Sequence, residues 1–434
     1  MKKLPMLGIA VGLWIGIASG LPTRTFTLDN GLQVILVQNR IAPLVTIVTA
    51  FHAGGTYETP VSNGVFHLYE HMLFKGNKTY PTQLAYMKRL RELGIVFNGS
   101  TSTERVEYHY TLPSSLLNEG LEFMRDAILY PLFDEKELEN EKTVVLDEYH
   151  RDFSNPYYIF SHAVSEAFYG KYFYRKNVIG DTSAIRGATR DLLLQIQRDF
   201  YNPENCILIV AGDLDFDQAE KAIRALWSVW EKTGKRPELP IVPHIQTTKE
   251  VILHLPVQTA SIRYLYAGPN VGKQTEDTYV GDVLGTIMNM PGSRFLSVFV
   301  DSGLASRASF GYYTQRYGGE ISFSFETSPE KVTPLRKRLD LFIKEMSQPG
   351  FFTEEDLEKA KQAMEIDYYK EQETASRYAI SLSFWVTIAD WEYYRTYLDH
   401  VRQVTLEDLQ RFVKTYLLNQ PHVEGVLLPE EVQG

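Results

Sequence analysis

A stretch rich in proline and charge divides this chain near its middle. Residues 231–250 read EKTGKRPELPIVPHIQTTKE, with three prolines, one glycine and charges of both signs. Proline ends helices and interrupts central strands, so this composition favours an extended linker. The chain has 434 residues, which is more than one ordinary hydrophobic core accommodates. The sequence therefore predicts two domains, residues 21–230 and 251–434, joined by the linker 231–250.

The two halves repeat a similar pattern. Each opens with a strand-like segment, at residues 31–37 and 251–255. Residues 133–142 (FDEKELENEK) are then echoed by residues 352–361 (FTEEDLEKAK), and both indicate an acidic helix start followed by a long amphipathic helix. The repeat indicates a duplicated domain, with chance similarity of two acidic helix starts as the alternative. The order of the patterns predicts an α+β fold: two related α/β domains, each a mostly antiparallel sheet with helices packed on one face.

The first 20 residues differ in character from the rest. Lys2 and Lys3 precede an uncharged apolar run that ends at Ile17, and the small residues 18–20 follow. This order is typical of a secretory signal, so residues 1–20 are predicted to be a signal peptide. We therefore expect export to the periplasm or the extracellular space. The alternative is an uncleaved segment that tethers the protein to a membrane, because the apolar run approaches spanning length.

Composition narrows the classes of partner. The chain is 44% apolar and 23% charged, as folded globular proteins are, and its formal net charge is −10. Nucleic acids and anionic membranes favour basic proteins, so neither is expected as a partner beyond the signal segment. Cys206 is the single cysteine, which excludes an intramolecular disulfide, and it begins an apolar run. We expect it to be a buried strand residue and not a nucleophile.

Two histidines and a glutamate form the most informative cluster of the sequence. His67 and His71 are four residues apart, so on a helix they share one face and could bind one metal ion. Glu70 lies between them, within reach of a water on that metal, where a carboxylate can accept and return a proton. A surface helix with incidental histidines is the alternative. The neighbours Val65, Phe66, Met72, Leu73 and Phe74 argue against it, because a buried helix would not carry these polar groups without compensation.

A catalytic zinc ion usually has three protein ligands, so a third must come from elsewhere in the chain. Residues 141–148 are predicted to be helical, and Glu141 and Glu148 share a face two turns apart. Spacing alone does not choose between these and the other acidic residues, most of which are solvated surface charges.

The segment HLYEHMLFKG, residues 67–76, resembles the inverted zinc motif of the pitrilysin/insulinase (M16) metallopeptidases. The resemblance extends through residues 201–205 and 211–213 and covers essentially the whole chain after residue 20. It implies Zn²⁺ as the cofactor, with Glu148 as the third ligand beside the two histidines and Glu70 as the catalytic base. Glu141 then corresponds to a further carboxylate that orients the site.

The same resemblance implies where substrate binds and how the halves differ. Residues 97–101 resemble the segment leading into the edge strand that binds peptide through main-chain hydrogen bonds, which makes Asn98 and Thr101 candidate substrate-binding residues. A turn residue is the alternative for Asn98. An offset near 215 residues maps the metal-binding helix onto residues 281–290, which hold no histidine or glutamate. The second half is therefore predicted to lack a metal site.

One feature of the family is missing. Active members carry an arginine and, seven residues later, a tyrosine in a C-terminal domain, where they stabilise the oxyanion. The arginine position is Phe299 or Val300 here, and the tyrosine position is Ser306 or Arg307. The resemblance therefore implies a dimer, in which a second M16-like subunit supplies the Arg/Tyr pair. A homodimer with other oxyanion donors is the alternative.

These observations predict an exported zinc metalloendopeptidase that hydrolyses peptides or unfolded protein segments as the zinc-bearing subunit of a dimer. Two other functions remain open: a non-catalytic assembly subunit of the M16-like type, and a metal-dependent hydrolase of a non-peptide substrate. Two histidines and one carboxylate favour zinc, and they also suit manganese or cobalt.

Overall fold

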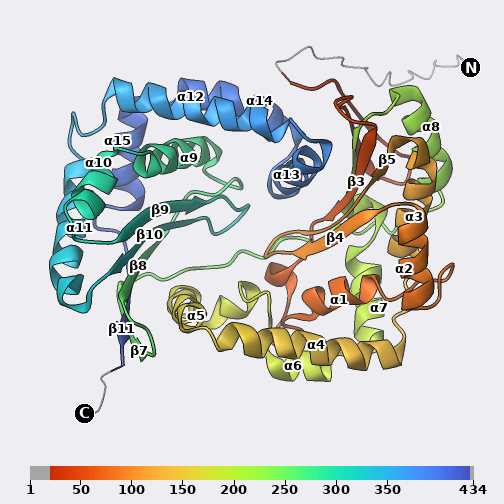
Figure 1. The fold of residues 1–434 in the computed structure, drawn as a ribbon, viewed down its shortest axis with the longest axis horizontal. Coiled ribbons are helices and arrows are strands. Elements are labelled where there is room, and N and C mark those ends of the chain that lie inside the picture. Colours follow the sequence, from red (N-terminus) through yellow and green to blue (C-terminus); the bar gives the residue numbers. More distant parts are fainter. Residues whose placement is uncertain (1–19, 431–434) are drawn as a thin grey trace, which may run out of the picture.

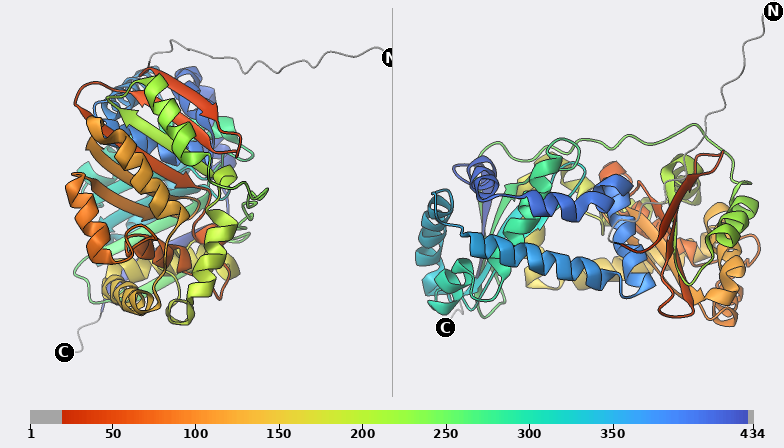
Figure 2. Two further views of the ribbon diagram at one scale, coloured as in Figure 1. Left: turned by 90° about the vertical axis from the view of Figure 1, so that its right-hand side faces the viewer. Right: turned by 90° about the horizontal axis from the view of Figure 1, so that it is seen from above.

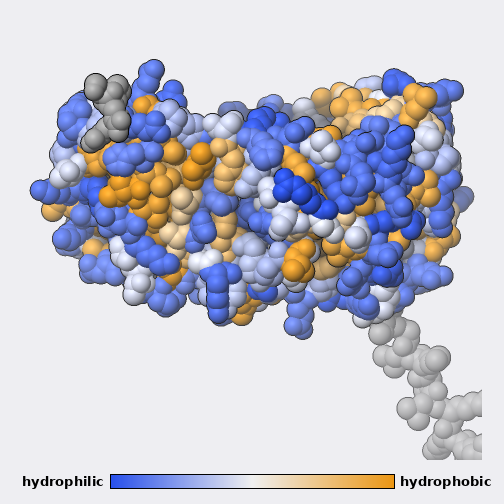
Figure 3. Space-filling view, turned by 90° about the horizontal axis from the view of Figure 1, so that it is seen from below, coloured by the Kyte–Doolittle hydropathy of each residue, from blue (hydrophilic) through white to orange (hydrophobic). Residues whose placement is uncertain are grey.

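The computed structural model describes residues 20–430. All but the last residue of the predicted signal peptide lies outside this range. Within it, no helix is both long and apolar enough to cross a membrane. Seen from below, the surface is mostly hydrophilic, with apolar side chains gathered in patches on both halves (Figure 3).

Each half is built on one sheet (Figure 1). The six-stranded sheet of the first half has the order β1-β2-β6-β3-β5-β4, and the five-stranded sheet of the second half has the order β7-β11-β8-β10-β9. All neighbours pair antiparallel except β2 with β6 and β7 with β11, which are parallel. The strands are β1 (Thr23–Thr27), β2 (Gln33–Gln38), β3 (Leu44–Phe51), β4 (Val96–Thr101), β5 (Val106–Pro113), β6 (Cys206–Gly212), β7 (Lys249–Leu255), β8 (Ala260–Ala267), β9 (Arg307–Tyr313), β10 (Glu320–Thr327) and β11 (His422–Pro429).

Each half contributes several helices, most of which cover one face of its own sheet. In the first half they are α1 (Val65–Leu73), α2 (Gln83–Glu92), α3 (Leu117–Leu129), α4 (Glu135–Phe153), α5 (Pro156–Tyr169), α6 (Thr182–Gly187), α7 (Arg190–Phe200) and α8 (Phe216–Trp227). In the second half they are α9 (Thr275–Asn289), α10 (Arg294–Leu296), α11 (Val332–Met346), α12 (Glu354–Glu371), α13 (Ala375–Ile388), α14 (Trp391–Gln403) and α15 (Leu406–Tyr416). The predicted α+β fold with two related domains is confirmed, and the two echoed segments begin α4 and α12.

The other face of each sheet is covered by a helix from the opposite half. Side chains of α13 pack on β2, β3 and β6, and side chains of α5 pack on β8 and β11. Leu382 of α13 and Val164 of α5 are both fully buried in these contacts. The sequence prediction had helices on one face of each sheet only, and this exchange of helices adds the second layer.

The segment between the halves is extended. Residues 231–248 contain no helix or strand, and Figure 2 shows this stretch, in green, running along the molecule from one half to the other. A hydrogen bond attaches this segment to the first half: the Arg236 guanidinium donates to Nε2 of His52 over 2.9 Å. Cys206 is buried at the start of β6, as its apolar surroundings predicted.

Candidate metal centre

Helix α1 owes its position to a buried carboxylate that precedes it. Gly64 begins the helix with a φ of 91°, which favours glycine, and it offers no side chain to cap the first turn. Glu58 supplies the cap instead, accepting hydrogen bonds from the backbone N–H groups of Gly64 at 2.8 Å and Phe66 at 2.9 Å. Asn63 donates a further bond at 2.9 Å. The carboxylate thereby satisfies donors that a helix start leaves unpaired.

The apolar face of α1 fixes the direction of its polar residues. The helix buries six side chains in the core of the first half: Val65, Phe66, Leu68, Tyr69, Met72 and Leu73. Each fully buried apolar side chain stabilises the fold by about 1.5–3 kcal/mol, so the helix cannot rotate without a large loss. His67, Glu70 and His71 therefore remain on the opposite face, which is half-buried.

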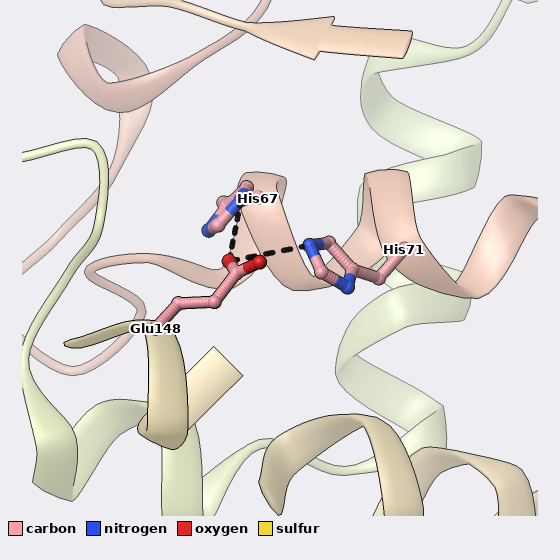
Figure 4. Close-up of side chains that lie close together, drawn as sticks. All are labelled: His67, His71 and Glu148. Carbon is pink, nitrogen blue, oxygen red and sulfur yellow. Dashed lines mark ion pairs between the residues drawn. The ribbon is translucent and has the colours of Figure 1, made fainter. Parts of the chain in front are cut away.

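Helix α4 brings Glu148 to the two histidines of α1. Its carboxylate oxygen Oε2 lies 3.7 Å from Nε2 of His67 and 3.7 Å from Nε2 of His71, as Figure 4 shows. One ligand atom from each residue lies within 4.8 Å of the others, and residues 20–430 contain no second such group of three His, Cys, Asp or Glu. The structure therefore brings together the three side chains that the family resemblance assigned as ligands.

The donor set fits a zinc ion. Ligand atoms about 2.1 Å from a tetrahedral zinc are ~3.4 Å apart, close to the 3.7 Å between Glu148 and each of the two histidines. Burial, with the neighbouring His71, lowers the pKa of His67 to about 4, so its ring is neutral at pH 7 and can offer a lone pair. The buried Nδ1 of His67 has no hydrogen-bond partner among the described residues, which leaves that ring without a competing polar contact.

Glu141 orients the second histidine from one side. Its Oε2 lies 3.1 Å from Nδ1 of His71, and its Oε1 lies 2.5 Å from Nζ of Lys75. Burial alone would raise the pKa of Glu141, but the hydrogen bonds from His71 and Lys75 outweigh it and lower the pKa. The ionised carboxylate holds the proton of His71 on Nδ1, and Nε2 is left to face Glu148.

Glu70 is held against the edge strand β4. The hydroxyl of Thr101 donates a 2.6 Å hydrogen bond to Oε2 of Glu70, and burial raises the pKa of this carboxylate. Gly99 makes the close approach possible, because a Cβ there would lie 2.9 Å from Cγ of Glu70 and 3.1 Å from the Tyr108 ring. Neither Gly99 nor Glu58 was among the predicted site residues. A glycine inside a strand is the one signal that pointed to a close contact.

The two predicted substrate-binding residues differ. Both belong to β4 itself, and not to a segment that leads into it. Thr101 lines the cavity beside the metal centre and contacts Glu70. Asn98 is exposed, and alternation along the strand places it on the opposite face from Gly99 and Thr101. It does not line that cavity.

A cavity of about 640 Å³ adjoins the metal centre, and both halves of the chain line it. His67, Glu70 and Glu148 line it from the first half, and the second half contributes Tyr313, Gln315 and Glu320. The turn between β9 and β10 reaches the first half because Glu104 accepts hydrogen bonds from two of its backbone N–H groups, that of Arg316 at 2.7 Å and that of Tyr317 at 3.3 Å.

The four candidate positions of the Arg/Tyr pair lie away from the metal centre. Phe299 is fully buried in the core of the second half. Val300, Ser306 and Arg307 line a different cavity, of about 770 Å³, on the second half. Within the described residues, none of the four lines the metal cavity.

The sequence matches two family models. Residues 33–182 match Insulinase (Peptidase family M16), and residues 187–364 match Peptidase M16 inactive domain. The chain is 26% identical over 343 residues to the zinc protease YmxG of Bacillus subtilis, covering 79% of this chain and 82% of that protein. It is 27% identical to a zinc protease of Rickettsia bellii, covering 81% of this chain and 86% of that protein.

Other relatives, matched over a smaller share of the chain, include a protein named as a subunit. The mitochondrial-processing peptidase subunit beta of Bos taurus is 27% identical over 226 residues, which covers 52% of this chain and 46% of that protein. Among solved structures, a protease from Helicobacter pylori has a TM-score of 0.85 at 20% identity, covering 94% of this chain and all of that one. This last similarity shows a shared fold.

Proposed function

This chain belongs to the insulinase (M16) family of peptidases, and on that premise we propose that it is an exported zinc metalloendopeptidase. It hydrolyses peptides or unfolded protein segments and acts as the zinc-bearing subunit of a dimer. The observation that carries the proposal is the convergence of His67, His71 and Glu148 beside the carboxylate of Glu70. Zinc is the metal of this family, and the relatives from Bacillus and Rickettsia are named zinc proteases.

The reaction divides between the metal and the chain. A zinc ion held by His67, His71 and Glu148 would supply Lewis acidity to the scissile carbonyl and to the attacking water. Glu70 accepts the proton of that water and then delivers it to the leaving nitrogen. Burial favours the first of these steps, because a carboxylate with a raised pKa accepts a proton more readily than an exposed one. The Thr101 hydroxyl keeps Oε2 of Glu70 in place during the transfer.

Substrate binds as an extended strand. β4 is the last strand of its sheet, so one row of its backbone N–H and C=O groups is free to pair with a peptide. Such pairing does not depend on side-chain identity, which suits an enzyme for varied or unfolded segments. The cavity beside Glu70 then receives side chains next to the cleaved bond.

The dimer is proposed because the oxyanion donors are missing from their family positions. A partner with an M16-like fold would present its Arg/Tyr pair to the metal cavity, as the name of the bovine relative, a subunit, also suggests. A homodimer would need other donors, and Arg151 and Tyr158 line the metal cavity of the same chain. If the purified chain alone cleaves peptides at a rate typical of the family, and Arg151→Ala with Tyr158→Phe abolishes that cleavage, the second-subunit proposal is wrong.

Export rests on the character of the first 20 residues. The expected mature chain begins near Leu21, which mass spectrometry of the protein from its native host would show. An intact N-terminus in the membrane fraction would instead indicate a tethered enzyme.

Exchange of Glu70 tests the catalytic assignment. Glu70→Gln should keep zinc and lower peptide hydrolysis about a hundred- to ten-thousandfold, because the amide cannot accept the water proton. His67→Ala or Glu148→Ala should lose the metal together with activity. Glu139→Gln, an exposed residue of the same helix as Glu148, is the control and should change neither. Peptide cleavage by Glu70→Gln at the wild-type rate would rule out the role of Glu70 as the base. If the wild-type protein binds zinc but cleaves no peptide in any dimeric form, the alternative of a non-catalytic assembly subunit is favoured.

A further inference from the structure

A second cavity, of about 660 Å³, lies in the other half of the molecule. Residues of helices α9, α12, α13 and α14 and of the edge strand β9 line it. Figure 1 shows these elements in the second half of the molecule. In the order of elements, α9, α12 and β9 correspond to α1, α4 and β4, which form the metal centre. The cavity is therefore the counterpart of the active-site cavity in the duplicated domain.

Acidic residues stand where two metal ligands would be. The offset of 215 residues places Asp282 at the position of His67 and Thr286 at that of His71. The echoed helix starts, which place Phe352 opposite Phe133, put Asp367 opposite Glu148. These residues no longer form a metal triplet, but they keep negative charge at the base and the rim of the cavity.

The charged side chains that line this cavity are all acidic. Three carboxylates line it, those of Asp282, Asp367 and Glu371, and the described lining residues include no Lys, Arg or His. Asp282 accepts a 2.8 Å hydrogen bond from the Tyr397 hydroxyl, and Glu371 accepts one of 2.9 Å from Ser381. Burial raises the pKa of Asp282 to about 7, and no Lys, Arg or His among the described residues that line the cavity offsets this effect.

The walls are aromatic, and one polar group is unsatisfied. Six aromatic side chains line the cavity: Phe310, Tyr312, Tyr368, Trp385, Tyr394 and Tyr397. Tyr394 is 3% exposed, and its hydroxyl lies close to those of Tyr368 and Tyr378 but makes no well-formed hydrogen bond among the described residues. A buried hydroxyl without a partner costs free energy, and a bound donor would restore the missing bond. Aromatic faces also attract organic cations.

We propose that this cavity is a second binding site, which takes an ammonium or guanidinium group on an alkyl stem, as in a lysine or arginine side chain of a bound peptide. Asp282 and Glu371 pair with the cation, the aromatic rings surround it, and Tyr394 accepts one of its hydrogen bonds. Met290 and Met364, which also line the cavity, suit the apolar stem. The volume of about 660 Å³ exceeds what a small inorganic ion fills. That the cation arrives on a peptide rests on the proposed function.

Binding to the full-length Glu70→Gln protein tests the proposal without hydrolysis. The probes are fluorescent peptides of eight residues that contain one arginine, one lysine, one citrulline or one norleucine and are otherwise identical. Citrulline and norleucine match arginine and lysine in shape and lack the charge. We expect the basic peptides to bind at least about tenfold more tightly, as expected for hydrogen bonds to charged groups. Free guanidinium and butylammonium ions form a further arm.

Variants assign the effect to the cavity. Asp282→Asn, Glu371→Gln and Tyr394→Phe should each reduce the preference for the basic peptides, and Asp367→Asn, at an exposed rim position, should do so without disturbing the fold. Glu355→Gln removes the same charge from an exposed position of α12 outside the cavity and should leave the preference unchanged. Thermal unfolding of each variant checks that it is folded.

The outcomes separate this proposal from the proposed function. Equal binding of arginine and citrulline peptides, or a preference that survives the Asp367→Asn and Tyr394→Phe exchanges, would overturn the second site. Free ions that bind as tightly as the peptides would overturn the peptide ligand. Absence of hydrolysis by the wild-type protein would count against the peptidase alone, because the charge preference is measured without cleavage.

Discussion

Glu141 and Lys75 illustrate how single residues prepare the metal centre without being ligands. The carboxylate bridges His71 and Lys75, with one oxygen 3.1 Å from Nδ1 of His71 and the other 2.5 Å from Nζ of Lys75. Burial lowers the pKa of His71, but the hydrogen bond to Glu141 and the charges of Glu148 and Glu70 outweigh it and raise the pKa, so a metal ion must compete with a proton on Nε2. Lys75 shares the negative charge of Glu141, which keeps the His71 proton on Nδ1.

Exchange of Glu141 measures this contribution. Glu141→Gln keeps the size of the side chain but removes its charge, so the ring of His71 is held less firmly. We expect zinc affinity to fall about ten- to a hundredfold, as for other residues that orient metal ligands. A competition titration with a zinc-binding dye measures the change, and Glu139→Gln, exposed on the same helix, is the matched control. Unchanged affinity would mean that Glu141 serves the fold alone.

At the scale of elements, the metal site depends on how α1 is anchored at its start and along its apolar face. Glu58 caps its start, and the apolar face of the helix is fully buried in the core. The far side of the helix faces α4, which presents Glu141 and Glu148 two turns apart. Because all ligands come from regular elements, their mutual distances follow from helix packing and not from loop conformation.

Removal of the Glu58 cap should weaken both the fold and the metal site. Glu58→Gln loses one acceptor and places an amide against backbone N–H groups, which should cost about 1–3 kcal/mol in the free energy of unfolding. Zinc affinity should also fall, because the start of α1 becomes less ordered. Thr353→Ala, which removes the cap of α12 in the other half, should cost about 1 kcal/mol and leave zinc affinity unchanged. Denaturant unfolding with parallel zinc titrations distinguishes the two variants, and equal zinc affinity in both would refute the coupling.

For the whole molecule, the sequence predicted the helices and strands better than it predicted which of them pack together. Periodicity and the repeated helix starts were sufficient for the α+β fold and its duplication, and the histidine spacing was sufficient for the centre of the site. The sequence did not predict the exchange of α5 and α13, because an apolar stripe shows that a helix face is buried and not which sheet buries it. The role of Glu58 was not predicted for a related reason. It is one of 54 acidic residues, and its burial depends on tertiary contacts that the sequence pattern does not show. Asn98 was assigned by resemblance, which gives a strand but not the face of an individual side chain.

The exchange of helices predicts that the two halves stay together when the linker is cut. Each sheet would expose an apolar face without the helix from the opposite half, so separation would cost the burial of both contacts. A protease site introduced after Glu238, an exposed position, leaves Arg236 on the first piece and the buried Val242 on the second. After cleavage, we expect the pieces to elute as one species in size-exclusion chromatography and to retain zinc.

A second variant makes this test decisive. Leu382→Ala removes a fully buried side chain where α13 meets the first sheet, at a cost of about 2–5 kcal/mol. In the uncut chain the linker keeps the halves at high effective concentration, so this variant should remain one folded species. In the cut chain the same loss should weaken association by a factor of thirty or more, so that the pieces separate on dilution, since about 1.4 kcal/mol corresponds to tenfold. Separation of the cut wild-type pieces under native conditions would show that the linker, and not the exchanged helices, holds the two halves around the metal cavity.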